Sequence, residues 1–466
     1  MAHKRIAALA TVMGLIALAG FGFWQSRRDP SRLIAGSPPQ PARPASRAQA
    51  DLFDPDAQHP WNRLHRQLYS RTTQAGKTYE QESLEPLFLP TSKFLTEGAS
   101  HRQAIALLDE FLKERADRRI KDPVKRAVLQ RDLWAVFATT AGFANLRLWE
   151  RGNGQLITHS LGSQDAGDTD LGRIAQRREL QKRLVQVMRR VALTVKEIRV
   201  LPDNLAAAVK GGSFPRTYDP KHPERPFLPA NLLDKQGPWV MVTTFPGLDQ
   251  LSLPRHVAFT KGRSLFLVFL RLPQGRPATL AYLKTMEDGK LPQFPAGTQV
   301  ALLRRTLLID NTGTLRTTPL TERLQIRVFR RGSHGELGTG DPHDFVLSRK
   351  DLFAGRNGGL RAVGADETSY FDFETHAGDV FEMKKRPPAA VLLKTCASCH
   401  ARHEGAGVVS LASIHEGDPK YPGLQPAEQE GKTYDLEAEA RPTINWTRKT
   451  YTWGLLQGLW ETQPGK

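Results

Sequence analysis

Apolar side chains recur at helical spacing in three stretches of the N-terminal half. They form stripes in residues 101–116, in residues 123–137 and in residues 171–200, the last of which is also very basic. Positions three and four apart share one face of a helix, so each stretch predicts an amphipathic helix. Ser100 is expected to cap the first, because serine hydroxyls accept hydrogen bonds from free N–H groups at helix starts. Residues 51–210 are therefore predicted to form a helical domain.

The pattern changes after residue 210 to short runs rich in β-branched and aromatic side chains. These runs are residues 239–244, 264–272, 298–309, 324–329 and 344–347. Such runs between Gly and Pro residues predict strands, and the segment from Asn311 to Gly313 between two of them predicts a hairpin turn. We expect a β-rich domain over residues 211–385 and a return to helices in residues 386–466. The expected fold class is α+β.

The N-terminus carries a pattern typical of export. Lys4 and Arg5 precede an apolar run, residues 6–24, that contains no charge. One interpretation is an uncleaved anchor within residues 1–28, because nineteen apolar residues are just long enough to span a bilayer. The alternative is a signal peptide cleaved near Ala19, which leaves a soluble periplasmic protein. Residues 29–50 are rich in Pro, Ala, Ser and Arg and predict a flexible linker.

Charge narrows the class of partner. The 466 residues contain 66 Lys and Arg against 48 Asp and Glu, which gives a net charge of +18. A basic surface of this size favours anionic partners such as an acidic redox protein or a lipid surface. Nucleic acid is not expected, because aromatic side chains do not interleave with the basic runs and the chain is predicted to be exported.

Both cysteines of the chain lie in one short motif. Cys396, Cys399 and His400 form the pattern C-x-x-C-H, which is the attachment signature of c-type haem. The two thiols form thioethers with neighbouring vinyl groups, and the histidine that follows binds the iron as proximal ligand. The sequence therefore predicts one covalent haem c. Two cysteines are too few for a disulfide-rich scaffold or a four-cysteine zinc site, and a single motif argues against a di-haem peroxidase.

The sixth iron ligand stays open at this point. No methionine follows Met383, so a methionine ligand from the C-terminal side is excluded. The candidates are His415, which follows the motif by fifteen residues, and Met383 upstream, with His343 and His376 also in the region expected to adjoin the haem. An iron without a sixth protein ligand is the further alternative. No catalytic residue is assigned.

A resemblance extends the interpretation. The C-x-x-C-H segment is similar to c-type cytochrome haem sites in general. Together with the runs at residues 297–302, 308–310, 321–328 and 351–355, it resembles uncharacterised exported mono-haem proteins of planctomycete-type bacteria. The resemblance implies a bacterial exported cytochrome and no known reaction.

Three functions follow from these observations. The first is a mono-haem cytochrome on the periplasmic side of the bacterial inner membrane, which is tethered by its N-terminus and carries single electrons. The second is a haem enzyme or a gas or ligand sensor whose sixth iron position is open. The third is a binding protein for a periplasmic ligand that carries haem as a redox appendage.

Overall fold

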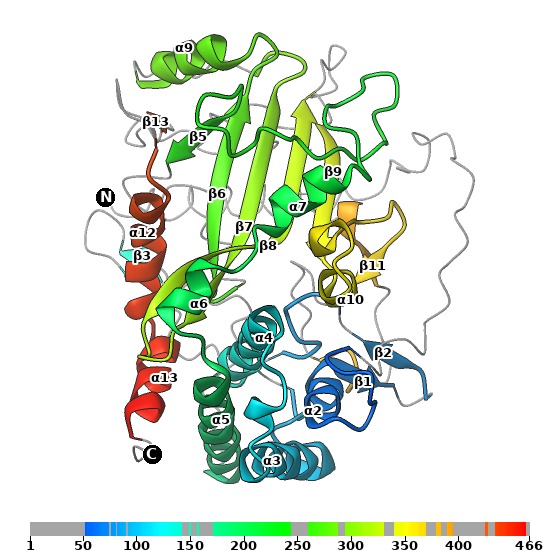
Figure 1. Cartoon of the computed structure of the whole chain (residues 1–466), viewed down its shortest axis with the longest axis vertical. Helices are drawn as coiled ribbons and strands as arrows, with labels where there is room; N and C mark the ends of the chain where they lie inside the picture. The colour runs from blue at the N-terminus through cyan, green and yellow to red at the C-terminus, as the bar shows by residue number, and fades with distance from the viewer. Residues whose placement is uncertain are drawn as a thin grey trace, which may run out of the picture. The chain divides into compact units, whose positions relative to one another are not determined.

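Helices and an antiparallel sheet make up the described part of the chain, which confirms the α+β class (Figure 1). The computed structural model describes residues 52–73, 76–80, 82–89, 92–141, 149–150, 156–157, 171–243, 260–287, 294–329, 340–369, 379–383, 389–394, 425–426 and 434–462. Residues 48–466 belong to one compact unit. Among the described residues, no helix is long and apolar enough to cross a membrane, and the apolar run 6–24 lies outside them.

The N-terminal helices follow the predicted stripes closely. They are α2 (Pro60–Tyr69), α3 (Gly98–Lys113), η3 (Ala116–Arg118), α4 (Pro123–Thr140), α5 (Leu171–Val191), α6 (Val195–Arg199) and α7 (Asn204–Gly211). Asp122 caps α4 by accepting hydrogen bonds from the N–H groups of Val124 and Lys125, as expected before a proline at the first helical position. The helices predicted within residues 101–116 and 123–137 are confirmed, but α4 is buried on every side from Ala127 to Thr140 rather than along one apolar stripe.

Two details of the helix prediction are wrong. Ser100 lies inside the first turn of α3 rather than at its cap, and its hydroxyl donates to the backbone oxygen of Glu97, the N-cap residue. The third helix ends at Val191 instead of continuing to residue 200. A capping box starts α6 there, because Thr194 and Glu197 satisfy each other's backbone N–H groups. This local signal overrides the apolar stripe.

The strands form one main antiparallel sheet. Its strands are β5 (Val240–Thr243), β6 (Ser264–Arg271), β7 (Gln299–Ile309), β8 (Leu315–Phe329), β9 (Gly340–Leu347), β10 (Leu360–Ala362) and β13 (Gln425–Pro426). Their order is β10-β9-β8-β7-β6-β5-β13. The predicted hairpin turn is confirmed, since Asp310 donates its N–H to Thr314 across the β7–β8 connection. The remaining described strands form pairs: β1 (Ser70–Thr72) with β2 (Thr78–Glu80), β3 (Trp149–Glu150) with β4 (Leu156–Ile157), and β11 (Thr368–Ser369) with β12 (Ala390–Val391).

Strand β8 is longer than its apolar run predicts and contains a bulge. Arg304 pairs with Arg323 whereas Arg305 pairs with Thr321, so Glu322 is the extra residue between them. A bulge redirects the side chain of the extra residue. Alternation along the undisturbed strand would place Glu322 on the same face as Leu324, yet its carboxylate contacts Arg304 on the other face.

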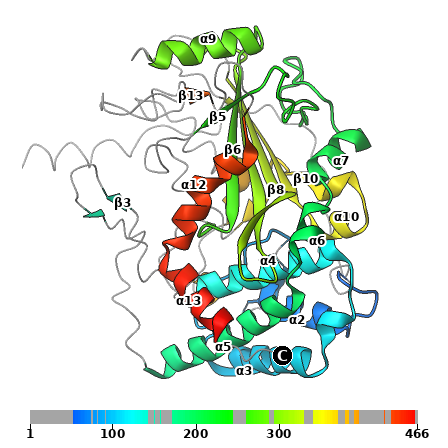
Figure 2. The same cartoon turned by 60° about the vertical axis from the view of Figure 1, so that its left-hand side comes forward.

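One hydrophobic core joins the helical and sheet parts. It includes Leu133 of α4, Leu184 of α5 and Leu303 of β7. The late helices α12 (Leu436–Arg448) and α13 (Tyr451–Glu461) contribute as well, and the rings of Trp134 and Trp453 lie 6.1 Å apart. Figure 2 shows these two helices running beside the sheet and onto α5. The predicted domain boundaries at residues 210 and 385 stay predictions.

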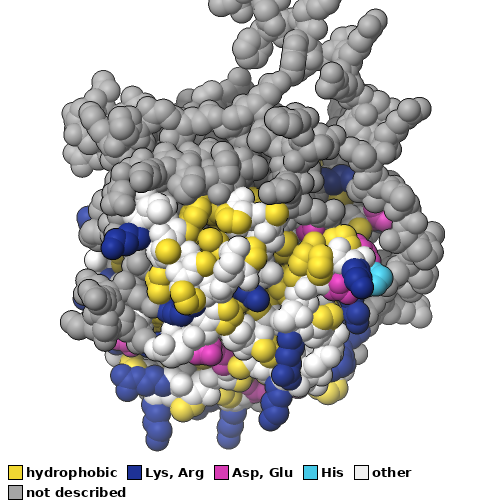
Figure 3. All heavy atoms as spheres, turned by 90° about the horizontal axis from the view of Figure 1, so that it is seen from above, with side chains coloured by type: hydrophobic (Ala, Val, Ile, Leu, Met, Phe, Trp, Pro, Cys, Tyr) yellow, Lys and Arg dark blue, Asp and Glu magenta, His cyan; other side chains and the backbone are white. Residues whose placement is uncertain are grey.

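Smaller helices complete the described part. They are α9 (Arg276–Glu287), α10 (Arg349–Phe353) and η5 (Asn357–Gly359). Helix α9 packs Tyr282 and Leu283 against Val240, Val242 and Leu270 at one end of the sheet. Seen from above, Lys and Arg side chains project around the rim of the described residues (Figure 3). This is consistent with the net charge of +18.

Candidate functional site: a buried arginine and glutamate network

The described chain leads up to the predicted haem motif without including it. Cys396, Cys399, His400 and His415 lie outside the described residues, as does His376. Lys394 is the last described residue before the motif. Two peptide units separate Lys394 from Cys396, so their Cα atoms are at most about 7.6 Å apart in any conformation. Residues 389–394 are therefore the described segment nearest to the motif along the chain.

Residues 389–394 are anchored to the sheet. Ala390 and Val391 of β12 pair with β11, and the N–H of Leu392 donates to the backbone oxygen of Glu367 at 2.9 Å. The Leu392 side chain is buried against Val346 of β9 and Val363. Leu392, four residues before Cys396, thus lies on the β9–β10 side of the main sheet.

Met383, a candidate sixth ligand, lies in a second anchored segment. Asp379 forms an ion pair of 2.8 Å with Arg71, and the carboxylate of Glu382 accepts hydrogen bonds from Ser92 and the N–H of Lys93, both at 2.8 Å. Met383 itself is half-buried. Its segment is thus fixed to residues near the N-terminal helices, Arg71, Ser92 and Lys93. The role of Met383 as an iron ligand stays a prediction.

His343 lies on the opposite face of the main sheet from Leu392, the residue that leads to the haem motif. It is buried on β9, where its ring contacts Phe227 at 5.2 Å between centroids. Successive side chains of a strand point to opposite faces. His343 therefore shares a face with Phe345 and Leu347, whereas Leu392 packs on the face of Val346.

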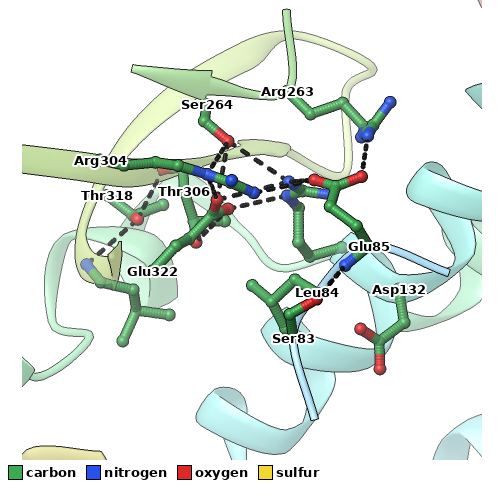
Figure 4. Close-up of polar contacts among 12 residues, drawn as sticks. Ser83, Leu84, Glu85, Asp132, Arg263, Ser264, Arg304, Thr306, Thr318 and Glu322 are labelled. Carbon is green, nitrogen blue, oxygen red and sulfur yellow. Dashed lines mark hydrogen bonds and ion pairs between the residues drawn. The ribbon is translucent and has the colours of Figure 1, made fainter. Parts of the chain in front are cut away.

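The described residues also contain a buried ion-pair network that sequence reasoning missed. We define it as Arg131 of α4, Glu85, Arg263 before β6, Arg304 of β7 and Glu322 of β8 (Figure 4). Arg131 is 0% exposed and Arg263 1%. Five separate segments of the chain thus meet at one polar centre.

The two carboxylates hold the three guanidinium groups together. Glu85 accepts from Arg131 and from Arg304, each at 2.8 Å, and also from Arg263. Glu322 accepts from Arg131 at 2.8 Å and from Arg304. The Ser264 hydroxyl at 2.8 Å and the Thr306 hydroxyl at 3.0 Å complete the shell of Glu322.

The pKa values show that both carboxylates stay ionised. Burial alone would raise the pKa of Glu322, but Arg131 and Arg304 outweigh it and hold that pKa at about 2. Burial likewise opposes ionisation of Glu85, and the three arginines lower its pKa nonetheless. Both carboxylates of the network therefore carry a constant negative charge near neutral pH and do not act as proton donors or acceptors there.

The charges of the network do not balance. Three arginines face two glutamates, which leaves one positive charge in a buried site. Nη1 of Arg131 and both Nε and Nη1 of Arg263 are buried and have no hydrogen-bond partner among the described residues. Burial, followed by the charge of Arg263, lowers the pKa of Lys261 to about 7, which favours the neutral amine over a further positive charge.

A second buried pair adjoins the network along α4. Arg349 binds Asp132 through Nε at 3.1 Å and through Nη2, and both side chains are about 1% exposed. Burial raises the pKa of Asp132 to about 6 despite Arg349. His65 stacks on Tyr69 with ring centroids 4.9 Å apart, and burial holds the pKa of His65 well below the ordinary value. The pair of Arg349 and Asp132, unlike the network, is balanced in charge.

Metal ligands do not cluster in the described part of the chain, where no group of three or more His, Cys, Asp or Glu side chains could hold a metal ion. No family model, curated protein or solved structure matches the chain.

Proposed function

We propose that this chain is an exported, membrane-tethered mono-haem c-type cytochrome that carries single electrons. The observation that carries the proposal is the motif of Cys396, Cys399 and His400, which contains the only two cysteines among 466 residues. The apolar run 6–24 supports it independently, because covalent haem attachment of this kind takes place outside the bacterial cytoplasm.

Each residue of the motif would have its own role. Cys396 and Cys399 would hold the haem by thioethers, and His400 would bind its iron. Bound haem c would supply a one-electron redox centre. The anchored segment 389–394 precedes the motif in the chain, and Leu392 is fixed against Val346 and Val363. An anchor of this kind would restrict the movement of a nearby attached haem relative to a docking partner.

The chemistry of the described residues fits a haem. A haem carries two propionate carboxylates, and the network offers buried guanidinium nitrogens that lack a partner among the described residues. The basic surface supports an acidic redox protein as partner, because opposite charges steer encounter.

The sixth ligand separates electron transfer from the alternative of a haem enzyme or sensor. We expect a six-coordinate, low-spin ferric spectrum if His415 or Met383 binds the iron. The variants Met383→Leu and His415→Ala identify the ligand, since loss of the low-spin spectrum in one of them assigns it.

A high-spin spectrum and rapid CO binding to the ferrous wild type would contradict the electron-carrier proposal and favour the sensor or enzyme. The full chain, matured in a bacterium that attaches c-type haem, is the sample for these spectra.

A further inference from the structure

The unbalanced network has the properties of a site for a carboxylate. A buried charge without a counter-charge costs several kcal/mol, and each buried donor without a partner adds to that cost. Here one net positive charge coincides with three unpartnered guanidinium nitrogens on Arg131 and Arg263. An anion bound here would offset the charge and would accept hydrogen bonds from the nitrogens that it contacts.

The charge of the donors narrows the class of anion. A phosphate monoester carries about −1.5 to −2 charges at neutral pH, which exceeds the single positive charge available. Nε and Nη1 of Arg263 remain after its Nη2 binds Glu85. Because these two nitrogens point to different sides of the guanidinium, each offers one charge-assisted hydrogen bond rather than a paired fork. The charge of the network therefore matches one monoanion, such as a carboxylate.

The sheet register connects this site with the haem motif. Arg304 lies opposite Arg323 on β8, and Arg323 lies opposite Val346 on β9. Residues paired in this way share one face, and two strand spacings amount to about 10 Å. Leu392 packs against that same Val346. Leu392, four residues before Cys396, thus packs on the face, and close to the row, that carries Arg304 of the network.

Burial favours a tethered carboxylate over a free one. Each of the three unpartnered nitrogens is buried from solvent, so an exchangeable anion would reach them only if the fold opened. A carboxylate on a covalently attached group stays at high effective concentration and is enclosed as the chain folds around it.

From these observations we infer that the network binds one haem propionate, with Arg263 and Arg131 as its hydrogen-bond donors. This rests on the proposed function, because the propionate arrives with the covalent haem. The network then keeps that propionate ionised and desolvated, and its charge becomes part of the field that sets the reduction potential.

The test compares the reduction potential of the holoprotein as a function of pH in wild type and in Arg263→Met, Arg263→Lys and Arg316→Gln. Arg316 is the control, since it is 41% exposed and paired with Asp310 at the far hairpin. We expect a potential that is nearly independent of pH between pH 5 and 8 in wild type and in Arg316→Gln, since the propionate stays ionised. Arg263→Met is expected to raise the proton affinity of the propionate about tenfold or more and to make the potential pH-dependent in that range, and Arg263→Lys is expected to restore part of the wild-type profile.

The outcomes separate the two proposals. Covalent haem with identical profiles in wild type and Arg263→Met overturns this inference alone, whereas a wild-type chain without covalent haem overturns it together with the proposed function. If Arg263→Met does not fold, a crystal structure of the wild-type holoprotein decides between the outcomes. A propionate oxygen within about 2.7–3.2 Å of Arg263 or Arg131 is expected, and two propionates bound elsewhere would contradict the assignment.

Added acetate gives a further test. If acetate raises the thermal stability of the holoprotein, and this effect is lost in Arg263→Lys, the donors bind a free anion, which would also contradict the assignment.

Discussion

Replacing Glu322 by Gln tests the energetics of the buried network most sharply. The substitution keeps the size of the side chain but removes the carboxylate that binds Arg131, Arg304, Ser264 and Thr306. Three buried arginines would then face Glu85 alone. Breaking one partner of a buried ion pair typically costs about 3–5 kcal/mol, because the remaining charge is left uncompensated.

The pKa gives a second measure of the same effect. The pKa of Glu322 falls from an ordinary value of 4.5 to about 2 in the folded protein. At about 1.4 kcal/mol per pKa unit, this corresponds to about 3 kcal/mol of stability. Because the folded pKa is lowered, the contribution is complete above pH 4.5 and is lost as the pH falls toward 2. The two measures agree.

The assay is chemical denaturation followed by the fluorescence of the buried Trp61, Trp134 and Trp239. At pH 7 we expect Glu322→Gln to lower the free energy of unfolding by about 3 kcal/mol and to flatten its fall between pH 4.5 and 2. Glu114→Gln is the matched control, since its pair with Arg119 is about 40% exposed and is worth less than about 1 kcal/mol. Equal losses in the two variants, or an unchanged acid profile, would refute the reasoning.

Three further changes have defined outcomes. Lys261→Met is expected to remove a rise in thermal stability between pH 7 and 10, because the folded pKa of about 7 lies below the ordinary 10.5 and the unfolded chain binds the extra proton in that window; an unchanged slope contradicts this. Thr194→Ala removes the capping box with Glu197 and should cost about 1 kcal/mol in urea denaturation, and no loss would refute the role of the cap. Leu392→Ala should cost about 2 kcal/mol by loss of its contacts with Val346 and Val363, and should lower the yield of holoprotein; wild-type stability would show that this anchor is unimportant.

The elements that the sequence predicted well are those with a strong local signal. The helix α4 has an apolar pattern, a capping aspartate and a proline at its start, and the β7–β8 turn has an Asn and a Gly between two apolar runs. The end of α5 was predicted wrongly because the capping box of Thr194 starts a new helix after it. Ser100 was predicted wrongly because α3 already begins at Gly98, after an N-cap residue, Glu97, whose side chain makes no capping hydrogen bond.

The buried network could not be predicted in the same way. Its members are separated by up to 237 positions, from Glu85 to Glu322, and each alone resembles an ordinary surface residue. Glu322 reaches the network only because a bulge redirects it. A weak signal was present, since Ser264, Arg304 and Thr306 interrupt otherwise apolar strands at positions facing one side.

The central claim is that one haem is bonded covalently to Cys396 and Cys399. The most direct measurement is the mass of the denatured full chain after maturation in a bacterium that attaches c-type haem. We predict a mass increase of one haem per chain, which persists in acid-acetone and is lost when both cysteines are replaced by Ala. A chain at the mass of its polypeptide alone, with haem that extracts freely or is absent, would contradict the account.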